Sequence, residues 1–141
     1  MVTEDRTGIE AVAGLIGDRW AMLVLRDVFR GLRRFDELCD DLGIARPVLV
    51  SRLTRLVNAG ILEKVPYQER PLRFDYRLTP KGVELSPALI ALMRWGDRWF
   101  GDGEPTADLV HTPCGHRFEQ AFWCSTCRTT FGPDAIKARP S

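Results

Sequence analysis

The chain has 141 residues, of which 45% are hydrophobic and 28% charged, and its formal net charge is +1. This size suits one compact domain with an appendage, because a domain typically takes ~100–150 residues. No apolar run approaches the ~20 residues that span a bilayer, and Glu4 and Asp5 stand where a signal peptide would be basic and then apolar. We therefore expect a soluble cytoplasmic protein with no membrane partner.

Four helices are predicted before residue 60. Apolar residues recur at three- and four-residue spacing in four segments. Asp18 can cap the second segment, Gly43 ends the third, and Pro47 is tolerated in the first turn of the fourth. The predicted helices are Ile9–Leu15, Arg19–Phe29, Phe35–Leu42 and Arg46–Ala59.

After the fourth helix the apolar pattern changes to a strand-like alternation. Ile61–Pro66 and Phe74–Leu78 read as two short strands joined by a polar, proline-containing loop over residues 67–72. Three short helices, a tight Gly-containing turn, a fourth helix and then such a hairpin have the order of a winged helix-turn-helix. We therefore predict a mainly α fold with a small β-hairpin.

A long fifth helix is predicted behind the hairpin, from Pro80 to Phe100. Thr79 is suited to cap this helix, with Pro80 in its first turn. Pro87 lies inside it, where a proline costs roughly 3 kcal/mol unless a kink or break absorbs it, so we expect a bend near Ser86. A Gly/Pro linker then ends the periodic pattern, so we predict a winged-helix domain over 1–103 and a small Cys/His metal-binding segment over 104–141.

The fourth helix carries a candidate DNA-reading face. At about 100° per residue its leucines fall on one stripe, and small, hydroxylic and guanidinium side chains point the opposite way. Residues 46–81 hold eight Lys/Arg against three Asp/Glu, a local net charge of +5 that suits phosphates. We predict contacts to double-stranded DNA by Arg46, Pro47, Ser51, Thr54 and Arg55, with Arg46 and Ser51 nearest the base edges.

Arginines outside this helix are further candidates. Arg70 and Arg73 lie in the predicted hairpin, or wing, where a guanidinium can enter the minor groove or clamp a phosphate. Arg73 could equally pair with Glu69 or Asp75. Arg19 at the start of the second helix, and Arg33 and Arg34 before the third, are candidates for phosphate contacts. A solvated surface is the alternative interpretation of these charges.

Several short motifs are distributed over more than half of the chain. Among them are Ile16-Gly17-Asp18-Arg19-Trp20, Arg33-Arg34-Phe35, Gly60-Ile61-Leu62, Phe74-Asp75-Tyr76 and Leu78-Thr79-Pro80-Lys81-Gly82. In order and spacing they resemble the HxlR-type helix-turn-helix regulators of bacteria. The resemblance implies a homodimeric transcription factor with one winged helix per chain, which binds inverted-repeat operators and dimerises through its terminal helices.

The apolar residues of the terminal helices support a dimer separately. They are more apolar surface than one small winged helix is expected to cover, unless they cover its own core. The predicted interface residues are Ile9, Val12, Leu89, Leu92, Met93, Trp95 and Trp99. A pocket for a small-molecule effector among Trp20, Trp95 and Trp99 is an alternative role for those rings.

Two features depart from the family pattern. Ala45 stands in the turn where relatives often have a capping Ser, which weakens the cap of the fourth helix. No cysteine precedes Gly17, whereas some relatives sense quinones or aldehydes with an N-terminal thiol. Cys39 is the only thiol of the predicted DNA-binding unit, and the neighbouring Asp40 and Asp41 would raise its pKa, so we expect a buried, inert cysteine.

Residues 111–127 read His-x2-Cys-x-His-x7-Cys-x2-Cys, which gives five candidate ligands where tetrahedral zinc takes four. We predict a zinc ribbon with one structural Zn²⁺ per chain, which would supply much of the folding free energy of a segment with few core residues. The favoured ligands are Cys114, His116, Cys124 and Cys127, with His111 as the alternative to His116. Free thiols, a Cys124–Cys127 redox pair and a site that fills only in excess zinc are the competing interpretations.

The sequence therefore predicts a DNA-binding transcriptional regulator, with repression as the expected direction. The alternatives are a winged-helix module that docks a protein, or a regulator that responds to a metal or to redox state. An enzyme is not expected, because there is no Gly-rich phosphate loop or Ser/His/Asp grouping, and both histidines lie in the Cys/His segment.

Overall fold

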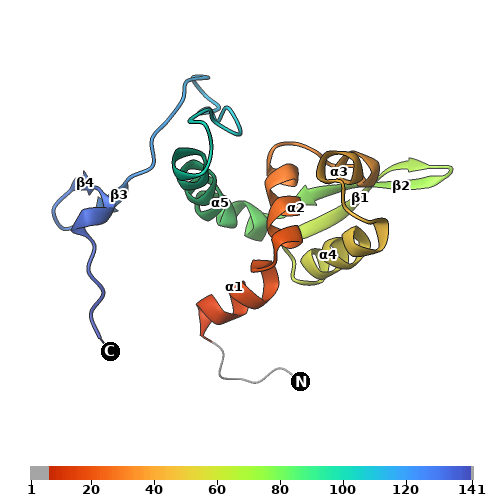
Figure 1. Cartoon of the computed structure of the whole chain (residues 1–141), viewed down its shortest axis with the longest axis horizontal. Coiled ribbons are helices and arrows are strands. Elements are labelled where there is room, and N and C mark those ends of the chain that lie inside the picture. Colours follow the sequence, from red (N-terminus) through yellow and green to blue (C-terminus); the bar gives the residue numbers. More distant parts are fainter. Residues whose placement is uncertain (1–6, 141) are drawn as a thin grey trace. The chain divides into compact units, whose positions relative to one another are not determined.

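The computed structural model describes residues 7–140, so Glu4 and Asp5 lie outside the described residues. The chain divides into two compact units, Met1–Leu92 and Met93–Ser141, and the boundary falls inside the fifth helix, before the predicted linker. The elements, drawn in chain order in Figure 1, are α1 (Gly8–Ile16), α2 (Arg19–Phe29), α3 (Phe35–Leu42), α4 (Arg46–Asn58), β1 (Leu62–Glu69), β2 (Leu72–Leu78), α5 (Pro80–Trp99), β3 (Phe122–Cys124), β4 (Thr129–Phe131) and a 3-10 turn (Pro133–Ala135).

The core of the first unit lies between α2, α3, α4 and the start of the hairpin. The leucine stripe predicted for α4 is confirmed, since Leu49, Leu53 and Leu56 are at most 1% exposed. Leu25 of α2 and Leu38 of α3 are fully buried against the same cluster. Burying such a side chain contributes about 1.5–3 kcal/mol to the free energy of folding, so this cluster fixes the position of α4 and the face that it exposes to solvent.

Polar groups define where α2 and α3 begin. Asp18 caps α2 as predicted, because its Oδ1 accepts the backbone N–H of Trp20 and of Ala21, both at 3.0 Å. At α3, Glu37 Oε2 accepts the backbone N–H of Arg33 and of Arg34, both at 3.1 Å. These two bonds lower the pKa of Glu37. Ala45 occupies the N-cap position of α4 and gives the helix no side-chain cap, which agrees with the departure seen in the sequence.

The wing, which is the β1–β2 hairpin, has longer strands than the sequence predicts. β1 and β2 pair from Leu62↔Leu78 to Glu69↔Leu72, so Arg70 and Pro71 alone form the turn, and the expected loop over 67–72 is wrong. Pro66 suggested a strand end, but it lies at a register irregularity where the missing N–H is tolerated.

α5 starts against the root of the wing. Thr79 Oγ1 accepts the N–H of Gly82 at 3.1 Å, which confirms the predicted cap, and the same hydroxyl donates to the carbonyl of Gly60. A Cβ at position 82 would lie 2.3 Å from the Ile61 carbonyl oxygen, so only glycine fits this close approach.

The helix continues through Pro87 without the break that we considered. Proline has no N–H for the carbonyl four residues before it, which is that of Val83. The hydroxyl of Ser86 donates to this carbonyl at 2.6 Å, so its hydrogen bond is replaced.

The second unit has little interior of its own. None of its described side chains is fully buried, and its regular structure beyond α5 consists of the short β3–β4 hairpin and the 3-10 turn. In the hairpin Phe122 and Phe131 pack with ring centroids 5.7 Å apart. The guanidinium of Arg94 donates to the Phe118 carbonyl at 2.7 Å and lies over the Phe118 ring. Among the described residues, no helix is long and apolar enough to cross a membrane.

Candidate nucleic-acid interface

The outward face of α4 is exposed and contains four of the five predicted groove residues. Arg46, Pro47, Ser51 and Thr54 are all exposed, and Val50 lies among them at 52% exposure. This face combines a guanidinium, two hydroxyls and two small apolar side chains. It has the size and chemistry to lie against base edges in a major groove.

Arg46 lies at the start of this face, where its side chain makes two contacts with α3. Its Nη1 lies 3.2 Å from Asp36 Oδ1, and its guanidinium carbon lies 4.8 Å from the centre of the Phe35 ring. The side chains of Arg46 and Asp36 are 67% and 71% exposed, so the pair is solvated and worth little. Arg46 can therefore exchange this partner for a nucleic-acid acceptor.

Arg55 is placed differently from the other four. Its guanidinium pairs with Asp18, the cap of α2, and its Nε is buried without a hydrogen-bond partner. Arg52, which was not among the predicted residues, pairs with the same carboxylate at 3.1 Å. Burial raises the pKa of Asp18, but the Ala21 N–H and the two guanidiniums outweigh it and lower the pKa to about 2. Arg55 thus joins α4 to α2.

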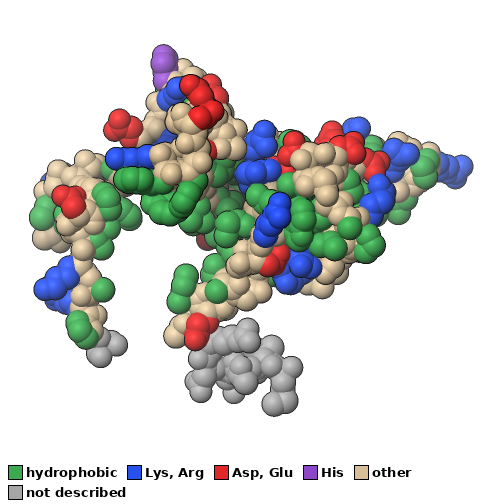
Figure 2. All heavy atoms as spheres, in the orientation of Figure 1, with side chains coloured by type: hydrophobic (Ala, Val, Ile, Leu, Met, Phe, Trp, Pro, Cys, Tyr) green, Lys and Arg blue, Asp and Glu red, His purple; other side chains and the backbone are tan. Residues whose placement is uncertain are grey.

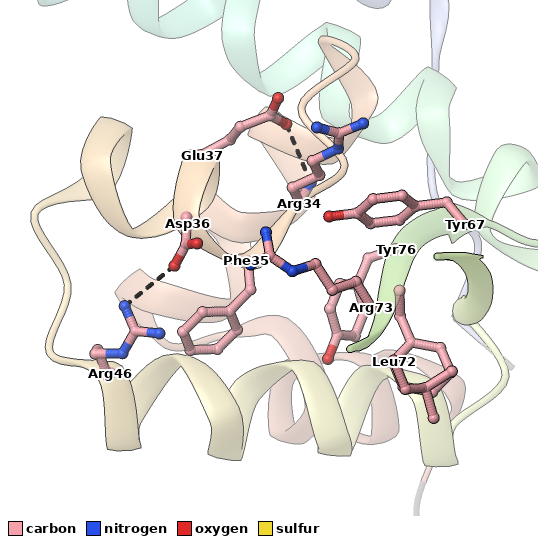
Figure 3. A pocket seen from close by; sticks show the side chains of 10 residues that line it. Arg34, Phe35, Asp36, Glu37, Arg46, Tyr67, Leu72, Arg73 and Tyr76 are labelled. Atoms are coloured by element: carbon pink, nitrogen blue, oxygen red, sulfur yellow. Dashed lines mark hydrogen bonds and ion pairs between the residues drawn. The ribbon is translucent and has the colours of Figure 1, made fainter. Parts of the chain in front are cut away.

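A cleft of about 530 Å³ lies between the start of α3, the start of α4 and the wing. Three predicted arginines, Arg34, Arg46 and Arg73, line it together, and Figure 3 shows Arg73 reaching from the wing toward Phe35. Arg34 lies over the Tyr67 ring, with its guanidinium carbon 4.3 Å from the ring centre. The carboxylates of Asp36 and Glu37 line the same cleft, and the three guanidiniums outnumber them, which suits a phosphate group.

Arg70 and Arg73 of the wing have no carboxylate partner among the described residues. The suspected carboxylate partner Asp75 pairs with Arg34 at 3.8 Å and with Arg77 at 3.1 Å, and within residues 7–140 Arg73 has no ion pair. Arg70 is exposed at the turn, where the Gln68 side chain donates to its carbonyl at 3.2 Å. Figure 2 shows Lys and Arg side chains along the wing to its tip.

Arg19 and Arg33 lie apart from the cleft lining. Arg19 is exposed, and its guanidinium carbon is 4.8 Å from the centre of the Trp20 ring. Arg33 is exposed, and its backbone carbonyl accepts the N–H of Tyr76 at 2.7 Å. Arg33 and Arg34 thereby connect the start of α3 to the wing.

A buried carboxylate behind the helix-turn-helix was missed by the sequence reasoning. Asp27 is fully buried and accepts from Arg26 at 2.8 Å and Arg30 at 3.3 Å, and both guanidiniums also approach Asp41 of α3. Burial raises the pKa of Asp27, against the attraction of Arg26. The available signal was an acid on the apolar stripe of α2, four residues after Leu23.

Cys39 is half-buried, and burial raises the pKa of its thiol. Asp36 and Asp40 raise it further, while Arg46 opposes them. The expected raised pKa is therefore confirmed, with Asp36 rather than Asp41 as the second carboxylate. A thiol with a raised pKa is mostly protonated near neutral pH and is a poor nucleophile.

The predicted dimer residues fall into two groups. Leu89 is 2% exposed within the core, so its surface is already covered inside the chain, and Met93 is half-buried. The others are exposed, from 39% at Val12 to 75% at Ile9; they are Ile9, Val12, Leu92, Trp95 and Trp99.

The five candidate metal ligands form local pairs. His111 Nδ1 lies 3.3 Å from Cys114 Sγ, and the Cys127 N–H donates to Cys124 Sγ at 3.4 Å. His116 meets His111 through its backbone, because its carbonyl accepts the His111 N–H at 2.8 Å. Across the described part of the chain, no three His, Cys, Asp or Glu side chains lie close enough together to hold a metal ion.

Comparison with known proteins gives a consistent result. A family model described as HxlR-like helix-turn-helix matches residues 15–104. The chain is 44% identical over 114 residues to the uncharacterized HTH-type transcriptional regulator Mb3122 of Mycobacterium bovis, an alignment that covers 80% of this chain and 72% of that protein. Among solved structures, PA1607 has a TM-score of 0.78 at 31% identity and covers 98% of this chain and 97% of its own. The redox regulator HypR in its reduced form has a TM-score of 0.61 at 25% identity, over 70% of this chain and 100% of its own.

Proposed function

Since this chain belongs to the HxlR-like helix-turn-helix family and is a transcriptional regulator of the winged-helix type, we propose that it is a repressor that binds inverted-repeat operators as a homodimer. The observation that carries this proposal is the open face of α4 beside an arginine-lined cleft. Arg46 and Ser51 would read base edges, while Arg34 and Arg73 would bind the phosphate backbone next to them. Such a regulator acts at the nucleoid, in the cytoplasm.

The homodimer is supported by apolar side chains that stay exposed in each unit. Ile9 and Leu92 are exposed in the first unit, and Trp95 and Trp99 in the second. A second copy of the chain would remove these side chains from water, and a two-fold dimer would present two copies of α4 to an inverted repeat.

We also propose that the Cys/His segment binds one structural zinc ion. The second unit has no fully buried side chain among its described residues, so it has little apolar burial with which to offset the entropy of ordering its chain. A bound metal would supply that free energy.

A redox-responsive regulator is the second candidate, favoured by the likeness to HypR. Cys39 does not suit the sensing role because its pKa is raised, so sensing would depend on Cys114, Cys124 and Cys127. This alternative predicts that mild oxidation changes operator affinity in the wild type and does not change it in a Cys124→Ser variant.

Operator selection tests the proposal directly. Random-sequence duplexes are enriched on the full-length protein, and the selected duplex is compared with a scrambled one at low and moderate salt. We expect an inverted repeat, two chains per duplex, a preference of about a thousandfold or more, and an affinity that falls with salt as phosphate contacts are screened.

Transcription from a promoter that contains the selected site should decrease when the protein is added, as expected of a repressor. Absence of enrichment together with salt-independent, weak DNA binding would contradict the proposal and favour the module that docks a protein.

A further inference from the structure

The Cys/His segment contains the same backbone turn twice. In residues 111–115 the N–H of Gly115 donates to the His111 carbonyl at 2.7 Å, and in residues 124–128 the N–H of Arg128 donates to the Cys124 carbonyl at 2.8 Å. The residue that closes each turn has a positive φ, +71° at Gly115 and +55° at Arg128. A bulky side chain rarely adopts this conformation, and Arg128 is the only non-glycine with positive φ among residues 7–140.

The flanking pairs are equivalent as well. Val110 pairs with Arg117 across the first turn, as Trp123 pairs with Thr130 across the second. His111 therefore stands where Cys124 stands in the second turn, and Cys114 stands where Cys127 stands. By the same alignment His116 occupies the position of Thr129, which pairs with Cys124 in the hairpin.

The distance within the first pair fits a shared metal. Tetrahedral zinc with Zn–N of about 2.0–2.1 Å and Zn–S of about 2.3 Å places its nitrogen and sulfur ligands about 3.5 Å apart. His111 Nδ1 and Cys114 Sγ are 3.3 Å apart, close to the separation that two ligands of one zinc ion require. In the second turn the Cys127 N–H donates to Cys124 Sγ, a bond that stabilises a thiolate ligand there.

We infer that His111, Cys114, Cys124 and Cys127 bind one Zn²⁺ between the two turns, and that His116 is not a ligand. The inference rests on the structural zinc proposed above and changes the ligand set favoured by the sequence. Each turn supplies two ligands. Because no three candidate ligands lie together among residues 7–140, metal binding would have to bring the two turns together. Binding releases the protons of the thiols and fills all four positions with protein atoms, as in a structural site.

Two histidine variants test the inference with the full-length chain. We expect about one zinc per wild-type chain after purification, loss of zinc in His111→Ala, and full zinc content in His116→Ala, the matched control. A competition titration with a chromogenic zinc chelator should show affinity falling more than about a hundredfold for His111→Ala. The Cys124→Ser variant should lose zinc as well.

Co²⁺ substitution gives a second measurement that a misfolded variant would not mimic. The wild type and His116→Ala should show the visible absorption of a tetrahedral site with three sulfurs and one nitrogen. Retention of that spectrum in His111→Ala, with its loss in His116→Ala, would overturn the inference. So would a wild-type chain that takes up no zinc.

Operator binding measured on the same samples separates this inference from the proposed function. A wild-type protein that binds its selected operator but holds no zinc contradicts only the metal site. A protein that holds zinc in the expected ligand set but does not bind DNA contradicts only the proposed repressor.

Discussion

Asp18 connects α2 to α4, the helix that carries the proposed DNA-reading face. One of its oxygens caps α2 through Trp20 and Ala21, and its carboxylate pairs with Arg52 and Arg55 of α4. Because α4 has no side-chain cap of its own, this carboxylate is a main polar constraint on its position. A single acid therefore affects both the stability of the fold and the presentation of the DNA-reading face.

Asp18→Ala should destabilise the protein by about 2 kcal/mol, because a lost N-cap costs ~0.5–2 kcal/mol and two guanidiniums lose their partner. The pKa of Asp18 in the folded protein is about 2, below its usual value of 3.8, so its contribution is present above pH 4 and is lost as the pH falls toward 2.

Urea denaturation at several pH values measures both effects. The exposed Glu84→Ala variant in α5 is the control and should be close to neutral. An Asp18→Ala variant as stable as wild type at pH 7 would contradict the assignment.

Arg46 and Arg70 should differ in the kind of DNA contact they make. Arg46→Ala should lower affinity for the selected operator about tenfold or more, with a smaller effect on scrambled DNA, because a bidentate contact to a base contributes ~1–3 kcal/mol. Arg70→Ala should weaken both duplexes alike and reduce the salt slope by about one.

Fluorescence anisotropy with both duplexes over a salt series distinguishes the two variants. Equal loss of specificity in Arg46→Ala and Arg70→Ala would show that the assignment of base and phosphate contacts is wrong.

At the scale of single elements, the junction of α4, the wing and α5 depends on a close backbone contact. Gly82→Ala would place a Cβ 2.3 Å from the Ile61 carbonyl oxygen, so the start of α5 must move away from Ile61. We expect a loss of about 1–3 kcal/mol, as for other overpacked sites.

Gly96→Ala in the same helix is the matched control, because a Cβ there meets nothing within 4 Å. It should stabilise the helix by about 0.5–1 kcal/mol. Thermal unfolding of both variants tests the opposite signs, and a neutral Gly82→Ala would show that the contact is easily relaxed.

Helix bounds were predictable from the sequence because the signals are local. Asp18, Gly43 and Thr79 act on residues within one turn of themselves, and the structure confirms the elements that they delimit. The wing strands were underestimated because Pro66 suggests a strand end, and only the pairing partner reveals that the register accommodates it.

The site was predictable in outline and not in its pairings. The exposed face of α4 follows from helical periodicity, whereas the pairing of Arg55 with Asp18 joins residues 37 positions apart and has no local signal. The spacing of the Cys/His segment likewise gave no choice between His111 and His116, whereas the repeated turn distinguishes their positions.

At the scale of the whole molecule, dimerisation is expected to depend on the late turns of α5. Trp99→Glu should place a charge in the proposed apolar interface and convert the dimer to a monomer at micromolar concentration. Its ring is 62% exposed in the single chain, so the substitution should leave the fold of the monomer intact.

Val50→Glu is the matched control, since Val50 is an exposed apolar residue on α4. It should remain dimeric and bind DNA poorly. Sedimentation equilibrium gives the mass of each variant, and a dimeric Trp99→Glu protein would exclude this part of α5 from the interface.

The junction around Thr79 has a mechanical consequence. The carbonyls of Ala59, Gly60 and Ile61, which end α4 and lead into β1, all accept hydrogen bonds from Thr79 or Lys81 at the start of α5. The end of α4, the start of β1 and the start of α5 thus share one hydrogen-bonded junction, so a displacement of the first turn of α5 would move α4 and the wing together. In the proposed repressor, a signal that shifts the start of α5 would therefore change operator affinity without touching the surface proposed to meet DNA.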